Sequence, residues 1–67
     1  MENKAPELIR LWAMREGRKL SWVAGQIPAN QGDLSRWLNG KCVPRRIFRI
    51  RLAEVTGLDV AAEEAWK

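Results

Sequence analysis

The chain has 67 residues, enough to close one hydrophobic core of marginal stability, so we expect a single domain over residues 1–67. With 46% apolar residues, no run of apolar residues that could span a membrane and charges throughout the first twenty positions, we expect a cytoplasmic protein without signal peptide or membrane anchor. The net charge is +4, and one cysteine without any histidine argues against a metal site, a disulfide or the usual catalytic proton shuttle.

The pattern of apolar residues predicts an all-α protein, because they recur at helical spacing and no alternating run of strand length occurs. Pro6 and Pro44 suit the first turn of a helix, where a missing N–H costs nothing. Gly17 and Gly57 offer C-terminal stops, and Asn30 can cap a helix that follows it. The five helices expected span residues 6–16, 20–27, 31–38, 44–55 and 60–66.

The second and third expected helices are joined by about three residues, which is the outline of a helix-turn-helix at about residues 20–39. Counted from Leu20, small or apolar residues stand at positions four, five, eight, ten, fifteen and eighteen: Val23, Ala24, Ile27, Ala29, Leu34 and Trp37. This pattern resembles the bacteriophage Cro/CI-type helix-turn-helix family, as do the segments LSRWLNGK, VP and RLAEVTGLD farther on. The resemblance covers residues 20–60 and implies a compact bundle of about five short helices that binds operator DNA as a homodimer and regulates transcription.

Three features depart from that family pattern. Pro28 stands where the family has a turn glycine, and Lys19 and Leu20 replace the polar pair that often starts the second helix. Gly32 lies inside the expected recognition helix, where it costs about 1 kcal/mol relative to alanine. We consider two explanations for Gly32: a close backbone approach to DNA, or a helix that begins later in the sequence.

The basic residues cluster in the middle of the chain. Six lie between residues 36 and 51 with no acidic residue among them, whereas acidic residues predominate from Leu52 onward. One positive face would suit a polyanion such as nucleic acid, the alternative being a solvated basic helix without a partner.

The recognition helix expected at about 31–38 would enter the major groove of double-stranded DNA. If Leu34, Trp37 and Leu38 face the core, helical geometry turns the family's base-contacting positions outward. These are Gln31, Gly32, Ser35, Arg36 and Asn39. Gln31 suits adenine, Arg36 suits guanine or a phosphate, and Ser35 suits either a base or the backbone. Asp33 is expected to stabilise the helix N-terminus, with acceptance from cytosine as the weaker alternative.

Basic and capping residues beside these two helices are the expected phosphate contacts: Arg18, Lys19, Asn30, Lys41, Arg45 and Arg46. If about four per subunit neutralise phosphates, a dimer gives a log-log salt slope of roughly −7. Arg49 and Arg51 are expected farther round the fourth helix, paired with Glu54 or with solvent.

The tryptophans divide between core and surface. Trp12 and Trp37 are expected in the core, and Trp22 occupies a position that the family usually exposes. An exposed aromatic residue on so small a chain suggests a subunit contact. We therefore consider Leu58, Val60 and Trp66 as candidates for a dimer interface, the alternative for Trp66 being that it folds back onto the first helix.

The leading functional hypothesis is a sequence-specific transcriptional repressor that occupies a palindromic operator as a homodimer. Alternatives with the same fold are an excisionase-like architectural factor or an antitoxin, and a different class is a protein-interaction module that has lost DNA binding. An enzyme is not expected, because no carboxylate pair, phosphate-binding glycine loop or activated nucleophile is visible. No cofactor, metal or small-molecule ligand is implied.

Overall fold

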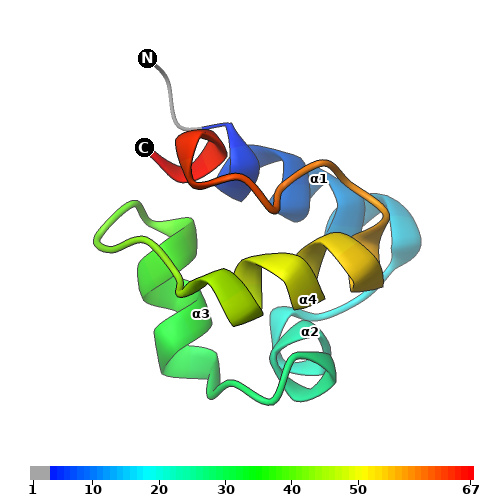
Figure 1. The fold of residues 1–67 in the computed structure, drawn as a ribbon. Coiled ribbons are helices and arrows are strands. Elements are labelled where there is room, and N and C mark those ends of the chain that lie inside the picture. Colours follow the sequence, from blue (N-terminus) through cyan, green and yellow to red (C-terminus); the bar gives the residue numbers. More distant parts are fainter. Residues whose placement is uncertain (1–3) are drawn as a thin grey trace.

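Helices account for the secondary structure of the chain (Figure 1). A computed structural model describes residues 4–67, and no strand occurs among them, which confirms the all-α prediction. The four α-helices are α1 (Ala5–Glu16), α2 (Leu20–Gln26), α3 (Gln31–Leu38) and α4 (Arg46–Thr56), and a 3₁₀ helix, η1 (Glu63–Trp66), follows them. None of these helices is both long and apolar enough to cross a bilayer.

One core holds the helices together. Helix α3 packs against α1 and α2, α4 contacts α2, and η1 lies beside the start of α1 (Figure 1). The largest fully buried aliphatic residues come from all four α-helices or their ends and from the segment before η1: Ile9, Val23, Ile27, Leu34, Leu52 and Val60. Trp37 closes one side, its ring centroid 5.2 Å from that of Phe48. The radius of gyration, 10.4 Å, is close to the value of about 11 Å typical of a compact domain of this length.

Local signals determine where α1 and α4 end. Gly17 and Gly57 follow them with φ angles of 67° and 73°, the left-handed conformation that closes a helix. The N–H of Arg18 donates to the carbonyl of Ala13 at 2.8 Å, which satisfies one of the last carbonyls of α1. The predicted first helix, residues 6–16, therefore differs from α1 by one residue at its start.

The predicted helix over residues 60–66 is wrong over its first three residues, and the rest is a 3₁₀ helix rather than an α-helix. Only the 3₁₀ turn at Glu63–Trp66 is helical, and Ala62 before it is extended. Two side chains explain the difference, because they take carbonyls that a helix would need. The indole Nε1 of Trp66 donates to the Val60 carbonyl at 2.8 Å, and Nε of Arg49 donates to the Ala61 carbonyl at 2.9 Å.

The fourth helix begins two residues later than predicted. Pro44 is fully buried and precedes an extended Arg45, and α4 starts at Arg46. Nη1 of Arg49 donates to the Pro44 carbonyl at 2.8 Å. Arg49 thus ties the start of α4 to the C-terminal segment, which corrects the expectation that it pairs with Glu54 or with solvent.

Replacing Gly25 with alanine is expected to stabilise the fold. Gly25 is exposed within α2, and a Cβ there would meet no atom within 4 Å. Alanine should therefore raise the free energy of unfolding by about 0.5–1 kcal/mol, measured by urea denaturation followed by circular dichroism. Gly57→Ala is the matched control: its Cβ is equally unobstructed, but the φ of 73° should make it destabilising by about 1–2 kcal/mol. Equal effects at the two sites would contradict this assignment.

Candidate nucleic-acid interface

Helix α3 starts at a well-formed cap. The side chain of Asn30 accepts a hydrogen bond from the Asp33 N–H at 2.7 Å, which satisfies one of the free amides of the first turn. The helix begins at Gln31 and includes Gly32, so the explanation that it starts after Gly32 is excluded. A Cβ at Gly32 would lie 3.3 Å from the Asn30 Oδ1 and would crowd the cap.

The two sides of α3 differ in character. Leu34, Trp37 and Leu38 are buried, as the sequence predicts. The five residues predicted to contact bases are all exposed: Gln31, Gly32, Ser35, Arg36 and Asn39. At about 100° per residue they occupy an arc of about 140° around the helix axis. The structure therefore brings these five onto one solvent-facing surface.

Side chains on this surface hold one another in place. Nη1 of Arg36 lies 2.6 Å from Oδ1 of Asp33, and the two side chains are 60% and 43% exposed. The amide Nδ2 of Asn39 donates to the Ser35 Oγ at 3.3 Å. Asp33 thus has a role beyond the helix N-terminus, because it orients the guanidinium that we expect to read a base.

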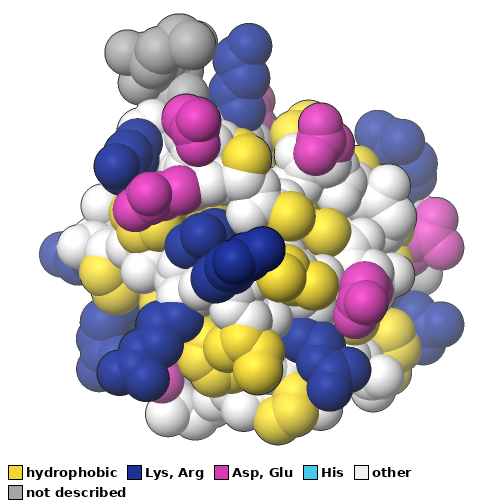
Figure 2. Space-filling model, in the orientation of Figure 1, with side chains coloured by type: hydrophobic (Ala, Val, Ile, Leu, Met, Phe, Trp, Pro, Cys, Tyr) yellow, Lys and Arg dark blue, Asp and Glu magenta, His cyan; other side chains and the backbone are white. Residues whose placement is uncertain are grey.

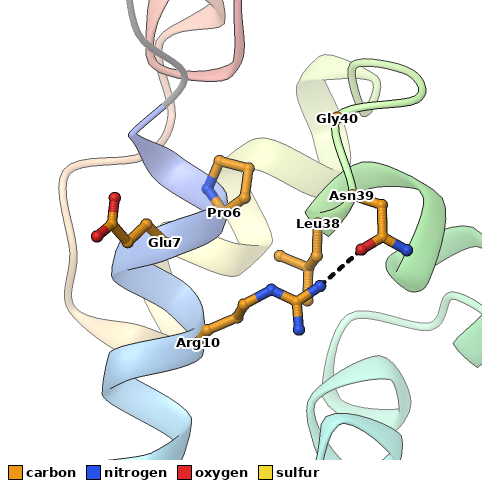
Figure 3. A pocket seen from close by; sticks show the side chains of 6 residues that line it. All are labelled: Pro6, Glu7, Arg10, Leu38, Asn39 and Gly40. Carbon is orange, nitrogen blue, oxygen red and sulfur yellow. Dashed lines mark hydrogen bonds between the residues drawn. The ribbon is translucent and has the colours of Figure 1, made fainter.

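Arg10 is a member of this site that the sequence did not indicate. Its Nη2 donates to Oδ1 of Asn39 at 2.9 Å, which links α1 to the end of α3 (Figure 3). The bond crosses a depression of about 310 Å³ formed where α1 meets the end of α3. Figure 3 shows Glu7 pointing away from Arg10, so the guanidinium is directed at Asn39 rather than at that carboxylate.

The five basic residues predicted to contact phosphates lie in two separate groups, apart from Asn30 at the start of α3. Arg18 and Lys19 precede α2, whereas Lys41, Arg45 and Arg46 lie in the connection to α4 and at its start; all five are exposed. Within residues 4–67 none of the five forms an ion pair. In Figure 1 the connection between α3 and α4 projects from the opposite side of the molecule to the connection between α1 and α2.

Trp22 supports the first of these groups. The guanidinium of Arg18 lies 4.3 Å from the Trp22 ring centroid, in a cation–π contact. Trp22 in turn stacks on Trp12, with ring centroids 6.4 Å apart and an interplanar angle of 29°. Trp22 is therefore half-buried between a cation and a second indole, which explains its place at a position expected to be exposed.

The candidates for a dimer interface lie in the core of the monomer. Val60 is fully buried, Trp66 is 2% exposed, and Leu58 is partly buried against the same core. Trp66 is therefore not the exposed aromatic residue that the dimer prediction assumed. The alternative, that Trp66 folds back onto the first helix, fits better because η1 contacts α1.

The turn between α2 and α3 demands a left-handed residue at position 28. The N–H of Ala29 donates to the Ala24 carbonyl at 3.0 Å, the bond that closes a helix when the residue before the donor has positive φ. Pro28 occupies that place with φ of 24°, although the proline ring favours about −65°.

Pro28→Gly is accordingly expected to raise the melting temperature, by the equivalent of about 1 kcal/mol. Glycine adopts positive φ without strain and restores an N–H for the helix end, and this gain exceeds its entropic cost. Thermal unfolding followed by circular dichroism measures the shift. A lower melting temperature than that of the parent chain would show that proline suits this turn.

No family model, curated protein or solved structure matches the chain. Among the described residues, no three His, Cys, Asp or Glu side chains gather as they would around a metal ion.

Proposed function

We propose that the protein is a sequence-specific DNA-binding transcription regulator in which α2 and α3 form a helix-turn-helix of the Cro/CI type. One observation carries the proposal. Helix α3 is anchored by a buried apolar stripe, and its opposite face presents five exposed residues on one arc. Four of the five have polar side chains and the fifth is Gly32, and a helix with such a face fits the major groove.

Each polar residue of this face has a chemical role in the proposal. Gln31, in the first turn, pairs with an adenine edge, and Arg36 donates to guanine O6 and N7. Ser35 and Asn39 form a hydrogen-bonded pair that offers a hydroxyl and an amide to bases or to the backbone. Arg10, on α1, positions Asn39 through the hydrogen bond to its Oδ1.

The exposed cations position the protein on the duplex in a sequence-independent way. Arg18 and Lys19 contact phosphates on one side of α3 and Lys41, Arg45 and Arg46 on the other, with Asn30 at the helix start. The absence of ion pairs for the five cations within residues 4–67 supports this role, because no intramolecular carboxylate has to be displaced. Repression follows when the protein, bound as a homodimer to a palindromic operator, occupies a promoter.

Selection of bound sequences from a random pool of double-stranded DNA tests the proposal. The expected result is a two-fold symmetric consensus whose enrichment disappears as salt rises, with a log-log slope of roughly −7 for the dimer. Arg36→Ala is carried through the same selection and should lose the preference at one position of each half-site. If no sequence is enriched even at low salt, the protein is not a sequence-specific DNA-binding regulator.

A further inference from the structure

Helix α4 presents an apolar face that no other part of residues 4–67 fully covers. Ile47 is 63% exposed and Ile50 is 38% exposed, although the opposite side of the helix buries Leu52. With Arg46, Arg51 and Glu54, the two isoleucines line an open groove of about 630 Å³. Over α4, Figure 2 shows hydrophobic surface lying between groups of Lys and Arg side chains.

We propose that a second copy of this chain packs its α4 against this face, antiparallel and about a two-fold axis near Ile50. The five residues that line the groove lie on an arc of about 140°, so they form one continuous surface. Arg46 and Glu54 stand on either side of Ile50, each one turn away. Antiparallel pairing therefore places Arg46 of each copy against the partner's Glu54 and makes two equivalent ion pairs.

The charges favour a second copy over another partner. An isologous contact requires a surface that is complementary to itself, and the basic start and acidic end of this groove meet that requirement. The isoleucines are β-branched, so they lose little side-chain freedom when a partner covers them. In such a dimer Arg46, proposed above as a phosphate contact, pairs with the partner subunit instead, so the phosphate contacts on that side reduce to Lys41 and Arg45.

Helix α1 offers a control with the same spacing. Leu11 is 43% exposed and lies one turn from both Glu7 and Arg15, which are exposed. This face repeats the order of charge, apolar residue and opposite charge, but its other exposed apolar residues, Leu8 and Met14, are not β-branched, and Met14 is flexible. A contact that merely needs opposite charges around an apolar residue would use α1 as readily as α4.

The inference rests on the proposed function in one respect, namely that a palindromic operator requires two copies.

Sedimentation of the full chain without DNA, across a range of concentrations, tests whether the chain dimerises through α4. Arg46→Glu and Glu54→Arg each place like charges together and should weaken the dimer by at least about tenfold, whereas the double variant should recover to within about threefold of the parent. Both substitutions agree with the helix dipole, so circular dichroism should show folded monomers.

Three results would overturn this interface. The parent chain could stay monomeric up to roughly millimolar concentration, or the single variants could associate as strongly as the parent. The third is that the Glu7→Arg control weakens association as much as Glu54→Arg does. The two proposals fail separately, because association is measured without DNA. A chain that dimerises through α4 but enriches no DNA sequence overturns only the regulator. A chain that enriches a two-fold symmetric sequence, but whose association is unchanged by the Arg46 and Glu54 variants, overturns only the interface.

Discussion

Replacing Trp66 with alanine is expected to lower the free energy of unfolding by about 3–5 kcal/mol. Trp66 is 2% exposed and contributes the last side chain of the core, where η1 meets α1. A domain of this length has only a marginal reserve of stability. The variant should therefore be largely unfolded at room temperature, as far-ultraviolet circular dichroism would show.

Trp66→Phe separates the packing of the ring from its hydrogen bond. Phenylalanine keeps much of the apolar surface but cannot donate to the Val60 carbonyl, which accepts from the indole at 2.8 Å. The loss should be about 1–3 kcal/mol, the cost of leaving a buried acceptor without a partner. Urea denaturation followed by circular dichroism measures both variants.

Lys67→Ala is the matched control at the neighbouring position. Its ion pair with Glu63, at 3.5 Å, is formed by side chains that are 62% and 52% exposed. Removing such a pair should change stability by no more than about 0.5 kcal/mol. If Trp66→Ala were as mild as this control, the C-terminal turn would not be part of the core.

Arg36→Ala is expected to weaken binding to the selected operator by about 10- to 100-fold, and binding to unrelated DNA much less. The difference arises because a base contact carries sequence discrimination and a phosphate contact does not. Electrophoretic mobility shift at constant salt measures both affinities. The Arg36–Asp33 pair is exposed, so the variant should retain its fold.

Arg15→Ala removes the same charge outside the proposed interface. Arg15 is exposed in the last turn of α1, and its loss should alter operator binding by less than about threefold. If Arg36→Ala lost no more affinity than this control, Arg36 would be a solvated surface residue and α3 would need another reading face.

Asp33→Asn, measured by the same mobility shift, is expected to raise affinity for DNA rather than lower it. The substitution removes a carboxylate that holds the Arg36 guanidinium at 2.6 Å and repels phosphates. Affinity for all sequences should rise, and the preference for the operator should fall because Arg36 is no longer held in one orientation. A parallel loss of affinity for operator and unrelated DNA would instead assign Asp33 to the stability of the helix start.

Signals within a few residues of one another determined where helices begin and end. Pro6 marks the start of α1 and Gly17 its end, and Asn30 caps α3 as predicted. The apolar stripe of α3 also decided which of its residues are exposed, because a helix that buries one side must present the other to solvent. Contact of that side with DNA stays a prediction.

Only the tertiary structure decided the contacts that join distant parts of the chain. The bond between Arg10 and Asn39 spans 29 residues, and no local pattern distinguishes Arg10 from Arg15, the other exposed cation of α1. Likewise, residues 60–62 of the expected final helix are not helical, because Arg49 and Trp66 donate to the carbonyls of Ala61 and Val60. Helix propensity depends on neighbouring residues in the sequence. The partner of a backbone carbonyl outside a helix depends instead on which side chains the tertiary structure brings close to it.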